Sequence, residues 1–276
     1  MKKVQVHAHR GGAALYPENT LPAFLNALTL KIDALEMDVV ISKDERAVVS
    51  HEPFFRYDLC INDRFEESQN SLFRLNYSEI KQIDCGSKSS QKFPNRKNVK
   101  AVKPLLTDVI REVLRACRET ERSIPTFTVE LKSRKDLIGI FQPELNRFAA
   151  LVMEDLKLLP RDKVILQSFD ADMMNHLHQA FPEYKLCFLS DDGISPEETL
   201  KKIKFKPDFI GLRHQLLSKS YASYCQSRAI QILVWTPNTS NDWSRLIDLG
   251  VDGIITDAPN SLIDWLDEKN LLAPER

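Results

Sequence analysis

Short apolar segments alternate along the chain with longer segments in which apolar residues recur every three or four positions. The first kind is typical of buried parallel strands and the second of amphipathic helices. The pattern predicts strands at 4–9, 34–40, 126–131, 164–168, 185–189, 209–212, 231–235 and 253–256. It predicts helices at 19–30, 107–120, 144–158, 171–180, 196–203, 218–226 and 241–249. Such an alternation over 276 residues favours an α/β fold, a closed TIM (β/α)8 barrel in which residues 1–276 form a single domain.

One apolar segment, 47–50, does not fit this alternation. Only six residues separate it from Val40, whereas a parallel crossover needs about a dozen or more. We therefore expect it to fold back on the second strand as an antiparallel arm. A turn centred on residues 44–45 would place His51 opposite Asp38.

The region between this arm and the third barrel strand is about twice as long as one strand–helix unit needs. We expect residues 52–103 to form an inserted subdomain or loop region at one end of the barrel. Its stretch 88–103 carries six basic residues and no acidic one. Two interpretations stay open, a solvated loop and a basic rim that attracts an anionic substrate.

Composition excludes several classes of protein. The 38 Lys and Arg residues balance 39 Asp and Glu residues, and a net charge of −1 argues against nucleic acid as the main partner. The longest apolar run, 148–153, has six residues, far fewer than the roughly 20 that span a bilayer. The first ten residues lack the apolar core of a secretory signal. We expect a cytoplasmic protein, or a periplasmic one if an export signal has been removed.

The cysteines support the same expectation of a reducing compartment. There are five, an odd number, and none forms a C-x-x-C pair. This favours free thiols over a disulfide framework or a zinc ribbon. Cys60 and Cys85 of the insertion would pair only in an oxidising compartment.

Acidic residues end two of the predicted strands in otherwise apolar surroundings. Glu36 and Asp38 lie on one face of the second strand and Glu130 near the end of the third. The carboxyl ends of barrel strands face the active site, so these carboxylates should converge. Because buried carboxylates repel one another unless a cation lies between them, we expect a metal site. A ligand set made only of oxygens favours one divalent cation, Mg²⁺ or Ca²⁺, over zinc.

Basic and aromatic residues follow other strand ends. His9, and His51 if the hairpin register holds, could act as base and acid beside a metal-bound phosphate. Arg10 and Lys132 would neutralise phosphate oxygens, and Trp235 would form a wall of the pocket. Asn19 is interpreted first as the N-cap of the helix that follows it.

Short motifs in the same order resemble those of the glycerophosphodiester phosphodiesterases, and the resemblance covers nearly the whole chain. The motifs are His9-Arg10-Gly11, Pro17-Glu18-Asn19-Thr20, Glu36-Met37-Asp38, Val49-Ser50-His51, Glu130-Leu131-Lys132, Gln167-Ser168-Phe169-Asp170, Trp235-Thr236-Pro237-Asn238 and Gly253-Ile254-Ile255-Thr256-Asp257. The resemblance implies a TIM barrel with an insertion after strand two. It also implies a divalent metal held at Glu36, Asp38 and Glu130, with catalytic histidines His9 and His51 and phosphate-binding Arg10 and Lys132.

The implied activity is the hydrolysis of glycerophosphodiesters to sn-glycerol 3-phosphate and an alcohol. One departure from the family pattern is Glu52, which follows His51 where Asp is common. Three alternatives remain open: a lysophospholipase D-like or sphingomyelinase D-like enzyme acting on lipids, a non-catalytic barrel that binds phosphorylated ligands, and a zinc amidohydrolase or phosphatase barrel that uses His7 and His9. Phe54 and Phe55 permit the lipid enzyme.

Overall fold

A computed structural model describes residues 3–64 and 70–272 of the chain. In these ranges, nine strands form one sheet in the order β1-β9-β8-β7-β6-β5-β4-β2-β3, and β1 also pairs with β2. The strands are β1 (Gln5–Ala8), β2 (Ala34–Ile41), β3 (Ala47–Val49), β4 (Thr126–Leu131), β5 (Val164–Ser168), β6 (Lys185–Ser190), β7 (Phe209–Arg213), β8 (Gln231–Trp235) and β9 (Gly253–Thr256).

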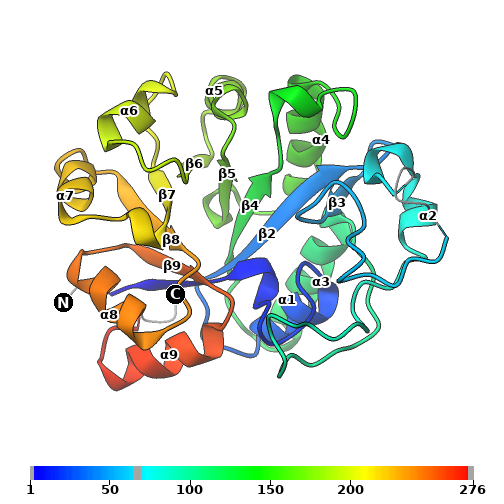
Figure 1. Ribbon diagram of the computed structural model, residues 1–276, viewed down its shortest axis with the longest axis horizontal. Helices are drawn as coiled ribbons and strands as arrows, with labels where there is room; N and C mark the ends of the chain where they lie inside the picture. Colours follow the sequence, from blue (N-terminus) through cyan, green and yellow to red (C-terminus); the bar gives the residue numbers. More distant parts are fainter. Residues whose placement is uncertain (1–2, 65–69, 273–276) are drawn as a thin grey trace.

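Parallel pairing closes the sheet into a barrel. β1 pairs in parallel with β9 on one side and with β2 on the other, so eight of the described strands form a closed ring. The strands occupy the centre of Figure 1, with helices around them. The predicted TIM barrel is confirmed.

Helices connect the strands, and all except α2, which belongs to the segment between β3 and α3, cover the outside of the barrel. They are α1 (Leu21–Ala27), α2 (Tyr77–Ile80), α3 (Leu106–Glu119), α4 (Leu145–Leu156), α5 (Ala171–Ala180), α6 (Pro196–Lys201), α7 (Lys219–Ser227), α8 (Ser240–Asp248) and α9 (Pro259–Glu268). Polar residues set where several of them begin: the side chains of Thr20, Asp170, Ser195 and Ser218 each accept a hydrogen bond from a backbone N–H of the first turn. Thr20, not Asn19, caps α1, so the interpretation of Asn19 as a cap is wrong.

Two hydrophobic clusters stabilise the barrel. The larger fills the space between the outer face of the sheet and the helices. A smaller one lies inside the ring and includes Ile165, Leu189, Phe209, Leu233 and Ile255. Because side chains fill the interior, the open space of the barrel lies at its two ends.

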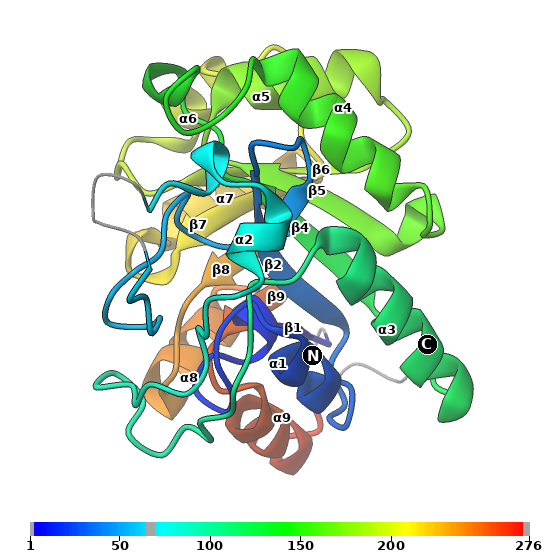
Figure 2. The same cartoon turned by 90° about the vertical axis from the view of Figure 1, so that its right-hand side faces the viewer.

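The segment between β3 and α3 has its own small core, which includes Phe55, Leu72 and Ile80. This segment faces the viewer in Figure 2. Residues 65–69 of the predicted insertion lie outside the described residues. Cys60 and Cys85 form a disulfide in this segment, so the prediction of free thiols is wrong for these two residues. They lie 25 positions apart in the sequence, and only the folding of the insertion brings them together.

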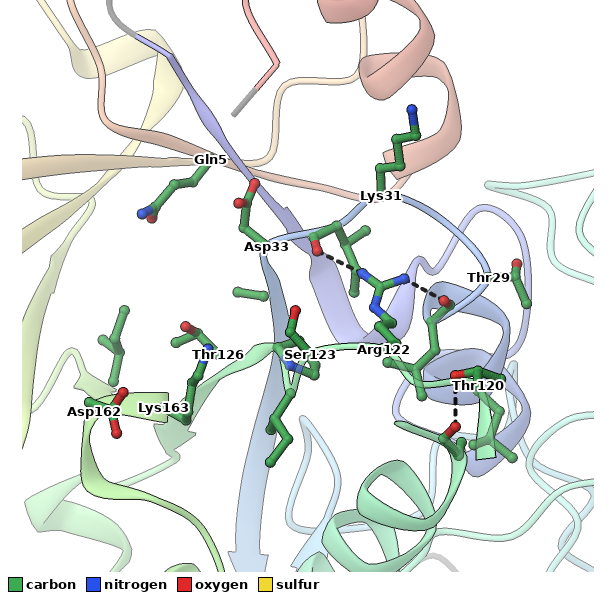
Figure 3. A pocket seen from close by; sticks show the side chains of 18 of the residues that line it. Gln5, Thr29, Lys31, Asp33, Thr120, Arg122, Ser123, Thr126, Asp162 and Lys163 are labelled. Atoms are coloured by element: carbon green, nitrogen blue, oxygen red, sulfur yellow. Dashed lines mark hydrogen bonds between the residues drawn. The ribbon is translucent and has the colours of Figure 1, made fainter. Parts of the chain in front are cut away.

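The amino ends of the strands surround a cavity of about 1170 Å³ that contains none of the predicted site residues. Figure 3 shows that Arg122 points into this region and bonds to backbone carbonyls of the loop after α1. One of these contacts, from Arg122 to the Ile32 carbonyl, is 2.8 Å long. Arg122 therefore links the segment before β4 to the segment before β2 at this end of the barrel. Separately, none of the described helices is long and apolar enough to cross a bilayer.

Candidate active site

His9 and Arg10 lie on a tight turn directly after β1. The strand ends at Ala8, one residue earlier than predicted, and Arg10, Gly11 and Gly12 all have positive φ. A Cβ on Gly11 would lie 2.9 Å from the Cβ of Ala23 in α1, so only glycine fits there. The turn points the backbone N–H of Arg10 at Glu36 Oε2, at 2.9 Å, and so attaches the first strand end to the second.

Three buried carboxyl groups meet at the carboxyl ends of β2 and β4. Glu36, Asp38 and Glu130 each offer an oxygen within 4.8 Å of the others. Parallel register places Asp38 directly beside Glu130, and the three residues are between 1% and 7% exposed. No other group of three or more His, Cys, Asp or Glu residues in the described ranges lies close enough together to hold a metal ion.

Electrostatics distinguish the three carboxyl groups. Burial and repulsion from Asp38 and Glu130 raise the pKa of Glu36 well above its ordinary value, and burial also raises the pKa of Glu130. Burial acts on Asp38 in the same sense, but the charges of Arg10, His51 and Lys132 hold its pKa well below the ordinary range. Two of the three groups, Glu36 and Glu130, thus resist ionisation in the absence of a cation. A divalent cation bound between them would stabilise their ionised forms.

Neighbouring side chains fix each carboxylate in place. Asn19 Nδ2 donates to Asp38 Oδ2 at 2.8 Å, and Gln167 Nε2 donates to Glu36 Oε1 at 3.0 Å. Lys132 Nζ lies 2.6 Å from Glu130 Oε1 and 3.7 Å from Asp38 Oδ1. These contacts limit the rotamers of the acidic groups before any ligand binds.

Arg10 lies between the acidic cluster and a further carboxylate. Its Nε is 3.2 Å from Asp38 Oδ2 and its Nη1 is 2.8 Å from Glu18 Oε1. The guanidinium is 15% exposed and lines the cavity at the barrel mouth. A ligand in this cavity can therefore reach Arg10 without displacing the residues that hold it.

Both predicted histidines are paired with a carboxylate through Nδ1. His9 Nδ1 lies 2.6 Å from Asp257 Oδ1, and His51 Nδ1 lies 2.8 Å from Glu52 Oε1. Contact with the histidine helps to lower the pKa of each carboxyl group, against the effect of burial, and that of Glu52 falls to about 2. An ionised carboxylate on Nδ1 favours the tautomer that keeps its proton there. The Nε2 atom of each ring is then the one available for proton transfer.

The hairpin brings His51 to the site in a different register from the one predicted. Val39 pairs with Val49, and the Ser50 N–H donates to the Asp38 carbonyl at 2.9 Å. Ser50, not His51, therefore lies opposite Asp38, and the predicted register is wrong by one residue. The reason is a five-residue turn, 42–46, closed by hydrogen bonds between Ser42 and Arg46.

The predicted site residues except Asp38 line one cavity of about 360 Å³ at the barrel mouth, and Asp38 lies directly behind it. Trp235 forms part of the wall, with its ring edge-on to Phe169 and 5.8 Å from the Arg213 guanidinium. His7 is not among the lining residues. It is buried deeper in the barrel, 3.1 Å from Thr128 Oγ1, which removes the ligand pair of the predicted zinc alternative.

Several residues at the site received no role from the sequence. Asp257 and Gln167 were recognisable as strand-end residues, and closure of β9 on β1 places Asp257 beside His9. Lys92 of the insertion reaches the cavity and lies 3.2 Å from Asp257 Oδ2. The only feature of the sequence that pointed to Lys92 was the basic stretch 88–103, which contains it. At this position the stretch extends over the barrel mouth.

Comparison with known proteins identifies the family. Residues 9–261 match the Glycerophosphoryl diester phosphodiesterase family. A glycerophosphodiester phosphodiesterase of Bacillus altitudinis is 28% identical over 266 residues, which cover 96% of this chain and 98% of that protein. A putative glycerophosphoryl diester phosphodiesterase of Silicibacter pomeroyi has a similar fold, with a TM-score of 0.88, 22% identity and coverage of 99% of this chain and 96% of that one.

A phosphodiesterase of Oleispira antarctica, solved with the product sn-glycerol-3-phosphate, also shares the fold. Its TM-score is 0.78 at 22% identity, with 96% of this chain and 97% of that one covered. The family match covers the turn after β1, the strands β2 and β4 that carry the three carboxylates, and the end of β9. Residues from all of these elements line the cavity. The chain belongs to the glycerophosphoryl diester phosphodiesterase family and is a phosphoric diester hydrolase.

Proposed function

We propose that this chain hydrolyses glycerophosphodiesters to sn-glycerol 3-phosphate and an alcohol, with one divalent cation at Glu36, Asp38 and Glu130 and with proton transfer by His9 and His51. One observation carries the proposal. Three carboxylates within 4.8 Å of one another adjoin a cavity lined by two imidazoles, each held through Nδ1 by a carboxylate.

The donor set fits a hard cation. It consists of carboxylate oxygens, in the described ranges no cysteine or histidine joins it, and the raised pKa values of Glu36 and Glu130 favour a bound positive charge. Mg²⁺ and Ca²⁺ both suit such ligands. When bound, the cation supplies Lewis-acid polarisation of a phosphoryl oxygen and a template for the substrate.

The residues of the chain supply the remaining chemistry. Arg10 and Lys132 lie at the cavity wall, where they neutralise non-bridging phosphoryl oxygens. One imidazole accepts a proton from the attacking hydroxyl, and the other donates one to the departing alkoxide through Nε2. Asp257 and Glu52 stabilise the charged form of the ring that has taken up the proton.

Two substitutions test the assignment of the histidines. His9→Ala and His51→Ala should each lower kcat on glycerophosphocholine by about 10²–10⁴-fold, because a positioned acid or base contributes about that much. Release of glycerol 3-phosphate is the measurement. His178→Ala is the matched control, since that ring stacks on Phe205 on the outside of the barrel. Near-normal turnover by both variants would refute the mechanism, and binding of the substrate without turnover by the wild type would favour the non-catalytic barrel.

A further inference from the structure

Lys103 is a buried lysine that the proposed mechanism does not use, and it lies where the inserted segment returns to the barrel. Its side chain belongs to a residue that is 9% exposed and that stands three residues before α3. The residues that follow it run beside β3: the Val49 N–H donates to the Pro104 carbonyl at 2.8 Å, and Leu105 forms an antiparallel bridge with Val48. The last part of the insertion therefore lies against the strand from which the insertion begins.

The ammonium group of Lys103 has a neutral partner. Its Nζ donates to Ser50 Oγ at 2.7 Å, and among the described residues it forms no ion pair with a carboxylate. Lysine is almost never buried unless it is paired, because an ammonium that leaves water without a partner of opposite charge costs free energy. An apolar side chain of similar volume would fill the same space at a lower cost. The burial of this lysine therefore points to a role for the ammonium group itself.

Hydrogen-bond chemistry fixes the direction of the contacts around Ser50. An ammonium can only donate, so Ser50 Oγ accepts from Lys103 and its own proton goes to the Glu52 carbonyl, 2.6 Å away. Ser50 is fully buried, and its N–H donates to the Asp38 carbonyl of β2. Lys103 thus closes the turn formed by residues 50–52, and this turn carries His51.

The same turn aligns His51 with its carboxylate. Glu52 Oε1 lies 2.8 Å from His51 Nδ1. Burial raises the pKa of Glu52, but contact with His51 and the charges of Arg56 and Lys103 bring it down to about 2. Lys103 is not among the residues that line the catalytic cavity. Its effect on a bound substrate must therefore pass through the turn.

We propose that Lys103 is a positioning residue, which acts through Ser50 to hold the turn 50–52 in the geometry that directs His51 Nε2 at the substrate. This inference rests on the proposed function and adds to it a residue outside the cavity. Lys103 itself transfers no proton and contacts no substrate. Without its ammonium group the Ser50 hydroxyl can rotate away and the turn gains freedom. Because a catalytic group has to be held to within about 0.5 Å of its productive position, the loss should appear in turnover.

Lys103→Met separates a positioning role from a structural one. It should lower kcat on glycerophosphocholine by about tenfold, the size of effect typical of groups that orient a functional side chain. The KM should change by less than about twofold, because Lys103 lies outside the cavity. The melting temperature should stay the same or rise, since methionine fills the space without a buried charge. Lys103→Arg, which keeps a positive charge and an N–H donor, should recover part of the lost turnover. Lys100→Met, at an exposed lysine of the same segment, is the matched control and should change none of these quantities.

Ser50→Ala shows whether Lys103 acts through the hydroxyl. On its own it should lower both kcat and the melting temperature, because it leaves a buried ammonium without its hydrogen-bond partner. Adding Lys103→Met should restore the melting temperature and leave kcat at the value of Ser50→Ala, since the two residues act as one unit. If Ser50→Ala does not fold, the comparison of Lys103→Met with Lys103→Arg still decides the inference.

The inference is overturned if Lys103→Met turns over substrate like the wild type, or if its kcat falls only in step with its melting temperature. It is also overturned if Lys103→Arg melts like the wild type but is no more active than Lys103→Met, or if Lys103→Met lowers kcat further in the Ser50→Ala protein. The histidine variants, assayed alongside, distinguish this failure from that of the proposed function. A slow His51→Ala together with a normal Lys103→Met refutes this inference alone. Near-normal turnover by both His9→Ala and His51→Ala refutes the proposed function, whatever Lys103→Met does.

Discussion

Lys92 and His9 contact opposite oxygens of the same buried carboxylate. Lys92 Nζ lies 3.2 Å from Asp257 Oδ2, and His9 Nδ1 lies 2.6 Å from Asp257 Oδ1. Lys92 belongs to the segment between β3 and α3, whereas Asp257 directly follows the last strand. The inserted segment thus touches the group that orients a proposed catalytic histidine.

The carboxylate of Asp257 should matter far more than the cation beside it. We expect Asp257→Asn to lower kcat on glycerophosphocholine by about 10²-fold or more, because the amide cannot stabilise a protonated His9 and can favour the wrong tautomer. The KM should change little. Lys92 is 69% exposed, and an ion pair of that kind contributes at most about 1 kcal/mol. Lys92→Gln should therefore lower kcat/KM by less than about fivefold.

Lys97 provides the control for this comparison. It lies in the same segment but contacts the Tyr16 ring, so Lys97→Gln should leave the rate unchanged. A loss with Lys92→Gln as large as that with Asp257→Asn would show that the insertion contributes directly to catalysis, and our assignment of a minor role would fail.

Replacing one acidic ligand should have opposite effects with and without a cation. In metal-free protein, Glu36→Gln should raise or preserve the melting temperature, because burial and the neighbouring Asp38 and Glu130 disfavour a charge at this position and the amide never carries one. In the wild type, Mg²⁺ or Ca²⁺ at saturating concentration should raise the melting temperature, since a ligand that binds only the native state stabilises it. Glu36→Gln should lose that increase. The measurement is thermal unfolding after chelation and after each cation is restored.

Glu112 of α3 supplies a surface control, because its carboxylate pairs with Arg115 in solvent. Glu112→Gln should retain the full response to the cation. If Glu36→Gln melts at a much lower temperature without a cation and still responds to one, the proposed ligand set is wrong.

The buried imidazole of His7 should make the protein less stable in mild acid. Burial lowers the pKa of His7 from 6.5 to about 4. Between these values the unfolded chain binds a proton that the native state does not, so the free energy of unfolding falls as pH falls from about 6.5 to 4. The loss attributable to His7 is about 3 kcal/mol, and it is absent above pH 6.5.

His7→Asn isolates this contribution because asparagine does not titrate. Urea denaturation of both proteins between pH 4 and 7.5 should show the wild type losing more stability than the variant, with the difference concentrated below pH 6.5. Parallel curves across that range would mean that His7 is protonated in the native state, against its burial beside Thr128.

Local patterns in the sequence determined the barrel and the identity of most of its site groups. Four strands, 126–131, 164–168, 231–235 and 253–256, have the predicted bounds, because each is a β-rich apolar run whose polarity changes at its ends. The same polarity change marked Glu36 and Glu130 as unusual, since a carboxylate in an apolar strand is costly without a partner. The helix Pro259–Glu268 was missed, although proline at its first turn is a recognised start signal.

Tertiary structure decided the partnerships among these groups. The register of the hairpin depends on the hydrogen bonds of its turn, and one residue of difference places Ser50 rather than His51 opposite Asp38. Closure of the barrel brings Asp257 to His9 across 248 positions, and folding of the insertion brings Cys60 to Cys85. Such contacts depend on how distant segments pack, and hydrophobic periodicity records only which face of each segment is buried.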